Sequence, residues 1–403
     1  MSNKLSDLLK YVETNNLFYK DRFKNANVSF LSDDNFSAKK LYEIPILYKK
    51  DIVQNYNRII TNGNLIDKLE KQQTSGSTGE PLWIYKTTQE IYKQSLHLWQ
   101  YRRNIASILP KDRYIRTHIS QRTGESISVP AIIENDNWIS LNMLSVDNSN
   151  LDNYYKKIID FKPKWFLVSP SFLHLMSSFI ISNKLNIPKI TYIELTGEVM
   201  PNALKKYFYD IWNCQISNHY GCRELYGIAL ECHLNNLHVV TDNVFVEVNN
   251  NKEYEDGYGE ILVTSLSNKA MPFIRYNVGD IGKLNYTTCE CGNKSPILEL
   301  LGGRQSEYIE TNSHKRIHSS IFHYVIKKVN IQNGDEILKF QIKKQCNTFI
   351  LLVAVKDINK FTSIANQIKD ELVSYMKEDK IVIEKMNFDS SYIHKSGKFC
   401  YII

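Results

Sequence analysis

The sequence contains no long apolar run, no internal repeat and no low-complexity tract. Its longest apolar stretches, such as residues 349–355, are far shorter than the roughly 20 residues that cross a bilayer, so we expect no membrane span. The N-terminal residues are polar and lack the apolar core of a signal peptide. With a hydrophobic content of 43%, these absences favour a globular, cytoplasmic protein.

Neither sign of charge dominates the sequence. The 50 Lys and Arg residues exceed the 43 Asp and Glu residues by only seven, and they are scattered among them. A nucleic-acid-binding protein would concentrate its basic residues in a patch or stripe with interleaved aromatic residues. We therefore expect a solvated surface and no nucleic-acid partner.

Segments of strand and helix character alternate along the first three quarters of the chain. Residues 83–85 have strand character, and Thr87 with Glu90 forms a capping-box pattern that predicts a helix to about Ile108. Two further strand–helix pairs are predicted, at 165–168 with 171–183 and at 190–195 with 203–212. This alternation predicts an α/β fold with mainly parallel sheets packed by helices.

The pattern changes after residue 304. Strands at 339–343, 348–355 and 380–386 and a helix at 359–376 predict a small α+β domain. The boundary follows Gly302-Gly303-Arg304, where glycine permits a hinge. We therefore expect a large N-terminal domain, residues 1–304, and a small C-terminal lid domain, residues 305–403, that rotates.

The strongest functional signal is the segment Thr74-Ser75-Gly76-Ser77-Thr78-Gly79. Six small residues in a row cannot build a core, whereas glycine lets the backbone approach a polyanion and consecutive N–H groups form an anion-binding nest. The segment lacks the Gly-Lys-Ser/Thr ending of the other common phosphate loop. The alternative is a flexible surface loop, which the strand directly after it disfavours.

Four further motifs carry functional side chains. Tyr220-Gly221-Cys222-Arg223-Glu224 combines an aromatic ring, a tight glycine and a carboxylate, which suits a nucleotide base and a cation. Arg275-Tyr276-Asn277-Val278-Gly279-Asp280 ends in a carboxylate that suits the two hydroxyls of a ribose. The last two are Gly303-Arg304 and Lys395-Ser396-Gly397-Lys398. Each motif alone is compatible with an ordinary turn or strand end.

In this order and at these separations, the five motifs resemble the adenylate-forming superfamily, whose enzymes activate a carboxylic acid as an acyl-AMP. The likeness is greatest to the phenylacetate–CoA ligase branch, which includes proteins of capsule biosynthesis, and it extends to residues 44–52. The resemblance implies ATP-dependent formation of acyl-AMP with release of pyrophosphate, followed by acyl transfer to CoA.

Two alternatives remain open. The acyl group could pass to an amine, which would make the protein an amide ligase of surface polysaccharide or small-metabolite biosynthesis. A non-catalytic relative that serves as a binding module is the other alternative. The joint presence of Glu224, Asp280 and Lys398 disfavours a non-catalytic role.

The resemblance also implies a role for individual residues in binding ATP. The residues that would hold the β- and γ-phosphates are Thr74, Ser75, Gly76, Ser77, Thr78 and Gly79. Gly197 and Glu198 would pass beside the adenine, and Tyr220 would stack on it. Asp280 and Arg304 would bind the ribose.

Two catalytic positions follow from the same resemblance. Glu224 would bind Mg²⁺ with Thr78 as a second contact, and Lys398 would engage the substrate carboxylate and the α-phosphate. Lys398 is preferred over Lys395 because it directly follows Ser-Gly. The chain departs from many relatives at the hinge, where Ser306 stands in place of an acidic residue.

The cysteines indicate a metal site rather than disulfides, because their number, seven, is odd. Cys289 and Cys291 form a close thiolate pair, and Cys232 with His238 could complete a tetrahedral zinc centre. A similar pair of half-sites in phenylacetate–CoA ligase-like proteins favours His238 over His233. Such a zinc would be structural, since protein fills all four positions. The alternative is three buried cysteines and a surface histidine.

Overall fold

The computed structural model of the chain describes residues 2–31, 38–61, 63–74, 82–118, 130–143, 148–198, 200, 202–250, 257–304, 308–312, 316–318, 320–373, 375–376 and 379–387. The chain divides into two compact units, each made of two stretches of sequence. Unit 1 contains Met1–Ser107 and His219–Glu299, and unit 2 contains Ile108–Asn218 and Leu300–Ile403. We describe each unit by itself.

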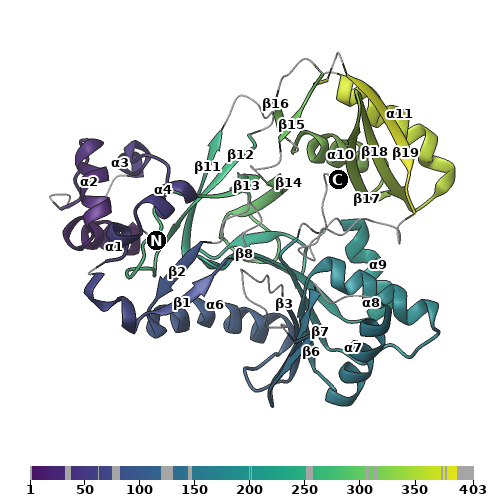
Figure 1. Cartoon of the computed structure of the whole chain (residues 1–403), viewed down its shortest axis with the longest axis horizontal. Coiled ribbons are helices and arrows are strands. Elements are labelled where there is room, and N and C mark those ends of the chain that lie inside the picture. Colours follow the sequence, from purple (N-terminus) through teal and green to yellow (C-terminus); the bar gives the residue numbers. More distant parts are fainter. Residues whose placement is uncertain are drawn as a thin grey trace. The chain divides into compact units, whose positions relative to one another are not determined.

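Unit 1 begins with short helices (Figure 1). They are α1 (Ser2–Asn15), α2 (Leu17–Asn25), α3 (Ala38–Glu43), α4 (Lys49–Gln54), α5 (Tyr56–Ile59) and the 3-10 helix η1 (Gly63–Lys68). A hairpin of β1 (Glu70–Gln73) and β2 (Trp83–Lys86) follows, and then α6 (Thr88–Ala106). The predicted capping box is confirmed: Glu90 N donates to Thr87 Oγ1 at 3.1 Å, and Thr87 N donates to Glu90 Oε2 at 2.8 Å.

The second stretch of unit 1 is a sheet. Its strands are β8 (Gln215–Cys222), β9 (Tyr226–Glu231), β10 (Leu237–Val239), β11 (Val244–Asn250), β12 (Gly259–Ser265), β13 (Tyr276–Asn285) and β14 (Ile297–Arg304), and their order is β11-β12-β13-β14-β10-β9-β8. Strands β8 and β14 each begin in one unit and end in the other. The described pairs β8–β9, β9–β10, β10–β14, β11–β12 and β12–β13 are antiparallel.

Unit 2 contains the parallel strands. They are β3 (Tyr114–His118), β5 (Trp138–Asn142), β6 (Trp165–Val168) and β7 (Tyr192–Thr196), with β4 (Ile132–Glu134) antiparallel at the edge. Helices α7 (Asn148–Phe161), α8 (Pro170–Ser182) and α9 (Asn202–Trp212) pack on this sheet, and buried side chains of the strands and helices form one core. Both predicted strand–helix pairs of this region are confirmed.

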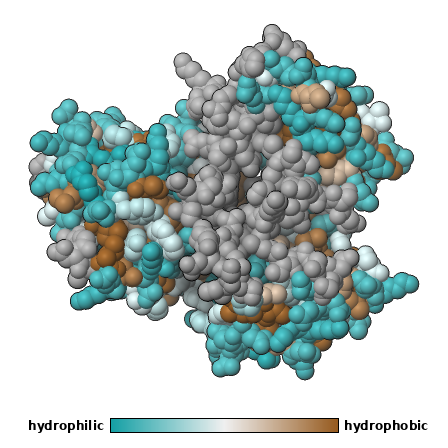
Figure 2. Space-filling view, viewed as in Figure 1, coloured by the Kyte–Doolittle hydropathy of each residue, from teal (hydrophilic) through white to brown (hydrophobic). Residues whose placement is uncertain are grey.

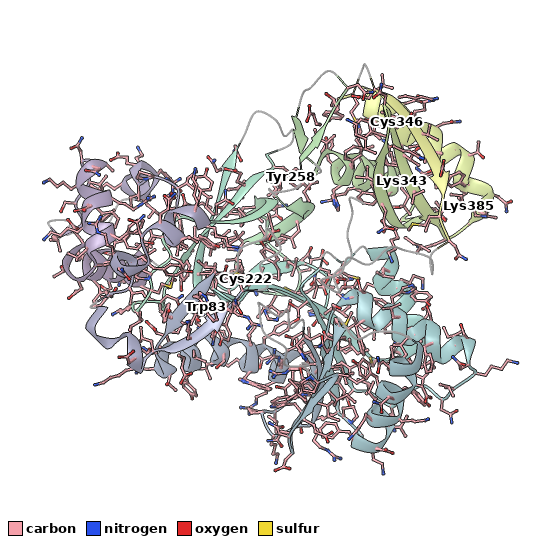
Figure 3. All side chains as sticks on the ribbon, viewed as in Figure 1. Trp83, Cys222, Tyr258, Lys343, Cys346 and Lys385 are labelled. Carbon is pink, nitrogen blue, oxygen red and sulfur yellow. The ribbon has the colours of Figure 1, made fainter. Side chains whose placement is uncertain are left out.

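The C-terminal stretch of unit 2 has a hydrophobic core of its own. Its elements are β15 (Tyr308–Glu310), β16 (Arg316–His318), α10 (Ser320–Gln332), β17 (Ile337–Gln345), β18 (Thr348–Val355), the 3-10 helix η3 (Ile358–Lys360), α11 (Phe361–Val373) and β19 (Lys380–Lys385). Strand β18 pairs antiparallel with β17 and parallel with β19. The predicted strands and helix are therefore present. The labels Lys343, Cys346 and Lys385 in Figure 3 mark this sheet and its β17–β18 turn.

The predicted α/β fold class is confirmed, with parallel pairing concentrated in unit 2 and antiparallel pairing in unit 1. The division into compact units does not follow the predicted boundary after Arg304, because residues 300–403 are grouped with residues 108–218. A separate lid domain that rotates stays a prediction. Among the described residues, no helix is long and apolar enough to cross a membrane. Figure 2 shows the visible hydrophobic residues as separate small areas among hydrophilic ones.

Candidate functional site

The predicted phosphate loop connects the two strands of the β1–β2 hairpin. Gln73 lies opposite Trp83 in the strand register. Beyond this pair, Thr74 N donates to Leu82 O and Leu82 N donates to Thr74 Oγ1, both at 2.9 Å. These hydrogen bonds close the base of the loop. Residues 75–81 lie outside the described residues, so the predicted phosphate contacts of Ser75, Gly76, Ser77, Thr78 and Gly79 stay predictions.

The motifs at residues 220–224 and 275–280 lie side by side in unit 1. The Tyr220 hydroxyl donates to Asp280 Oδ2 at 2.8 Å, and the Tyr276 hydroxyl donates to Glu224 Oε1 at 3.1 Å. Burial, followed by the charge of Glu224, raises the pKa of Tyr276 well above its usual value, so its phenol stays protonated and remains a donor. Two segments that are far apart in sequence thus form one polar site.

Glycines set the backbone of both motifs. A Cβ on Gly221 would lie 1.9 Å from the backbone oxygen of Tyr226, at a point where the β8–β9 register shifts. Only glycine fits such a close approach. Gly279 has a φ of +85°, and its N–H donates to Asn277 Oδ1 at 2.8 Å. These glycines place Glu224 just past one strand end and Asp280 within β13.

A buried lysine beside this site was missed by the sequence analysis. Lys86, the last residue of β2, is 0% exposed, and its Nζ donates to Gln94 Oε1 at 2.6 Å and to Arg223 O at 3.1 Å. The same Nζ lies 4.3 Å from the centroid of the Tyr226 ring. Desolvation lowers the pKa of Lys86 to about 7. In Figure 3, Trp83 marks the hairpin and Cys222 the neighbouring turn.

The period-2 pattern of β2 was the signal that could have identified Lys86. Leu82, Ile84 and Lys86 alternate along the chain and therefore share one face. All three side chains are 0% exposed. A lysine on the buried face of a strand requires polar partners, which its sequence neighbours alone do not identify.

In unit 2, the predicted adenine segment follows β7. Gly197 has a φ of +86°, and Glu198 Oε2 accepts from Ser171 N at 3.0 Å and from Ser171 Oγ at 2.6 Å. Ser171 lies in the first turn of α8, so the carboxylate of Glu198 caps this helix favourably. The predicted position of Gly197 and Glu198 beside the adenine stays a prediction.

Besides the phosphate loop, Arg304 and Lys398 are predicted site residues with no described side chain. Arg304 is the last residue of β14, but its side chain lies outside the described part of the chain, and Lys398 lies outside it altogether. The roles predicted for Arg304 in ribose binding and for Lys398 in catalysis therefore stay predictions.

The four predicted zinc ligands lie together in unit 1. Each of the four residues offers one ligand atom, and these atoms all lie within 4.8 Å of one another; the residues are Cys232, His238, Cys289 and Cys291. A tetrahedral zinc with Zn–S bonds of about 2.3 Å requires sulfur atoms about 3.8 Å apart, so the cluster is compact enough for this ion. His233 is not part of the cluster.

Hydrogen bonds around the cluster orient its ligands. His238 Nδ1 lies 3.0 Å from Ser295 O, a pure acceptor, so Nδ1 carries the proton and Nε2 faces Cys291 Sγ at 3.3 Å. Asn236 Nδ2 donates to Cys289 Sγ at 3.3 Å. Hydrogen bonding, first of all by the Cys291 backbone, lowers the pKa of Cys289 to about 6, whereas burial raises the pKa of Cys291, so Cys289 is the thiolate of this pair.

Known proteins share this fold and part of this sequence. A phenylacetate-coenzyme A ligase from Thermus thermophilus is 23% identical over 181 residues, which are 42% of this chain and 41% of that protein. A 2-hydroxyisobutyryl-CoA ligase in the postadenylation state has a TM-score of 0.73 at 13% identity, over 100% of this chain and 88% of its own. No family model matches the chain.

An amide-forming enzyme has the same fold. A GH3.15 acyl acid amido synthetase has a TM-score of 0.61 at 11% identity, over 100% of this chain and 90% of its own. The fold and the motifs together thus define the class: the chain resembles the acid ligases of the adenylate-forming superfamily, as its sequence predicted. Within that class, the curated relative is a phenylacetate-coenzyme A ligase, the branch that the motifs indicated.

Proposed function

We propose that this protein is an ATP-dependent ligase that converts a carboxylic acid to acyl-AMP, releases pyrophosphate and passes the acyl group to CoA. One observation carries the proposal. The motifs 220–224 and 276–280 are joined by two side-chain hydrogen bonds, Tyr220 to Asp280 and Tyr276 to Glu224. This pairing gathers an aromatic ring and two carboxylates in one place, next to the turn that Lys86 contacts.

Each group has a part in the first half-reaction. Asp280 accepts hydrogen bonds from the ribose hydroxyls, and the Tyr220 ring stacks on the adenine. Glu224 is 8% exposed and offers a carboxylate oxygen, which is a preferred ligand of Mg²⁺. The bound ion supplies positive charge that stabilises the negative charge developing at the phosphates.

Lys398 is proposed to serve acyl-AMP formation and not the second step. A lysine is a compact charge on a flexible arm, suited to the substrate carboxylate and the α-phosphate. Rotation of residues 305–403 would withdraw it and admit the acceptor. The 2-hydroxyisobutyryl-CoA ligase has been solved in postadenylation and thioesterification states, which supports a two-state scheme for this chain.

The acceptor has two candidates. The similarity to phenylacetate-coenzyme A ligase and to 2-hydroxyisobutyryl-CoA ligase supports the CoA thiol as acceptor. The similarity to an acyl acid amido synthetase supports an amine. The metal cluster is proposed to hold a structural zinc, because its four positions are filled by protein donors and the ring of its histidine is oriented by the hydrogen bond from Nδ1 to Ser295 O.

The test is an acid-dependent pyrophosphate-release screen over aryl, fatty and amino acids, repeated with CoA and with amines. We expect release only with ATP, Mg²⁺ and a suitable acid. Glu224→Gln should lower the rate by several orders of magnitude. Asp242→Asn is the matched control, since that exposed carboxylate pairs with Lys4 at 2.7 Å. Normal adenylation by Glu224→Gln would remove Glu224 from the metal role.

The role of Lys398 is tested by separating the two steps. Lys398→Ala should slow acyl-AMP formation by roughly a hundredfold or more, the usual value of one preorganised charge contact. Transfer from chemically made acyl-AMP should be nearly unchanged. If Lys398→Ala carries out both steps at normal rates, Lys398 is a solvated residue without a catalytic role. If the variant loses both steps, the two-state scheme is contradicted.

A further inference from the structure

Lys86 joins the phosphate-loop hairpin to the turn that carries Glu224. Its backbone belongs to β2, directly after the loop, while its Nζ donates to the carbonyl of Arg223 at 3.1 Å. Its aliphatic stem lies on the same buried face as Ile84. The Tyr226 ring, whose centroid lies 4.3 Å from Nζ, adds a cation–π contact.

The contacts of Lys86 continue into a chain of buried amides. Gln94 accepts from Lys86 Nζ and donates to Asn268 Oδ1. Asn268 Nδ2 in turn donates to Glu224 O at 3.0 Å. The consecutive carbonyls of Arg223 and Glu224 therefore accept hydrogen bonds from Lys86 and Asn268. Gln94 links these two side chains to each other. Such a closed network fixes the backbone of the turn more firmly than separate contacts would.

We propose that Lys86 is a positioning residue for Glu224: with Gln94 and Asn268 it fixes the Arg223–Glu224 turn, and it ties the geometry of that turn to the hairpin that carries the phosphate loop. The inference rests on the proposed function, in which Glu224 and the loop act on the same ATP–Mg²⁺. Tyr276 orients the carboxylate of Glu224 from its other side. Lys86 thereby acts through Glu224 and not on the substrate.

Lys86→Met tests this role because it keeps the length of the stem and removes the donors and the charge. We expect a higher Mg²⁺ requirement and a roughly hundredfold lower rate of pyrophosphate release, the usual cost of a misplaced catalytic group. Lys86→Arg restores charge and donors and should recover part of the loss. Lys71→Met is the matched control, since Lys71 lies on the same hairpin, 4.0 Å from the Trp83 ring centroid, and is exposed.

Hydrogen exchange gives a readout that does not depend on turnover. The amides of residues 222–226 should exchange at least tenfold faster in Lys86→Met, while those of β11 and β12 stay as in the unchanged protein. If no acid supports pyrophosphate release by the unchanged protein, the proposed function fails and the exchange experiment still decides the role of Lys86.

Two results would overturn the proposal. One is a folded Lys86→Met protein with unchanged exchange at residues 222–226. The other is an unchanged Mg²⁺ dependence in an active variant. If Lys86→Met does not fold, Gln94→Leu decides, because it keeps Lys86 and breaks its link to Asn268, together with one long hydrogen bond of 3.5 Å from Gln94 to Ser265 Oγ. The proposal then expects faster exchange of the turn, and unchanged exchange contradicts it.

Discussion

Removal of the zinc that we propose for the Cys232–His238–Cys289–Cys291 cluster should destabilise unit 1 measurably. The cluster joins the β9–β10 hairpin, which carries Cys232 and His238, to the segment after β13, which carries Cys289 and Cys291. A metal that links His238 to Cys289 closes a loop of roughly 50 residues, and a crosslink of that length stabilises a fold by about 4 kcal/mol. For a unit of roughly 190 residues, this corresponds to a melting temperature lower by roughly 8–16 °C.

The assay combines metal analysis with thermal melting. The purified protein should contain one equivalent of zinc, and Cys289→Ser with Cys291→Ser should lose both the zinc and the stability. Cys346→Ser is the control, because Cys346 is exposed and lies outside the cluster. A strong chelator should lower the melting temperature of the unchanged protein alone. Absence of zinc after gentle purification, or a double variant that melts as the unchanged protein does, would refute the reasoning.

Three further predictions concern the site and its support. Tyr276→Phe removes a hydrogen bond to the buried Glu224 carboxylate that is worth about 1.5–3 kcal/mol. The Mg²⁺ concentration needed for half-maximal pyrophosphate release should therefore rise roughly tenfold or more. An unchanged Mg²⁺ concentration would contradict this prediction. The pKa of Lys86 is about 7 in the fold against 10.5 in the unfolded chain, so the folded state binds fewer protons between these values. The free energy of unfolding, measured with urea, should therefore rise with pH across this window by at most about 1.4 kcal/mol per pH unit more than it does in Lys86→Met. Arg275→Met breaks the buried pair with Glu247 (3.1 Å) and should cost about 3–5 kcal/mol in urea unfolding, whereas a midpoint unchanged within error would show that the pair is not needed.

Local patterns in the sequence predicted local structure well. The capping box at Thr87 and Glu90 needs only four consecutive residues, so its geometry could be read directly and is confirmed. The metal cluster needs two pairs far apart in sequence, and thiolates rarely gather without a metal or a disulfide. The chemistry of the residue types suggested Cys232 with a histidine as partners of Cys289 and Cys291, and the resemblance to phenylacetate–CoA ligase-like proteins favoured His238 over His233.

Other contacts between distant segments could not be predicted. Lys86 contacts Arg223, which is 137 positions away, and no pattern near either residue indicates the other. Ser171, at the start of a helix earlier in the chain, donates to Glu198, and the predicted adenine contact of Glu198 stays a prediction. Both contacts depend on which strands become neighbours in the sheet. That is decided by the packing of the whole unit and not by the periodicity of a single element.

The N-terminal segment and the ribose motif are connected by the backbone. Leu47 N donates to Arg275 O at 3.0 Å, and Asn277 N donates to Leu47 O at 2.9 Å. Arg275 has a φ of +51°, a conformation that costs a non-glycine residue about 1–3 kcal/mol. Its guanidinium offsets that cost by binding Glu247 and the carbonyls of residues 42 and 44.

The turn at Arg275 sets the direction in which β13 begins. Tyr276 precedes, and Asp280 lies within, an irregular stretch of β13 in which the register with β12 shifts and Gly279 has a φ of +85°, and both residues reach the 220–224 motif. A change in the direction of the strand would move both contacts together. Leu47, in the segment at residues 44–52 that shares the resemblance to acid ligases, is thus hydrogen-bonded to the start of the strand on which Asp280 and Tyr276, the partner of Glu224, are placed.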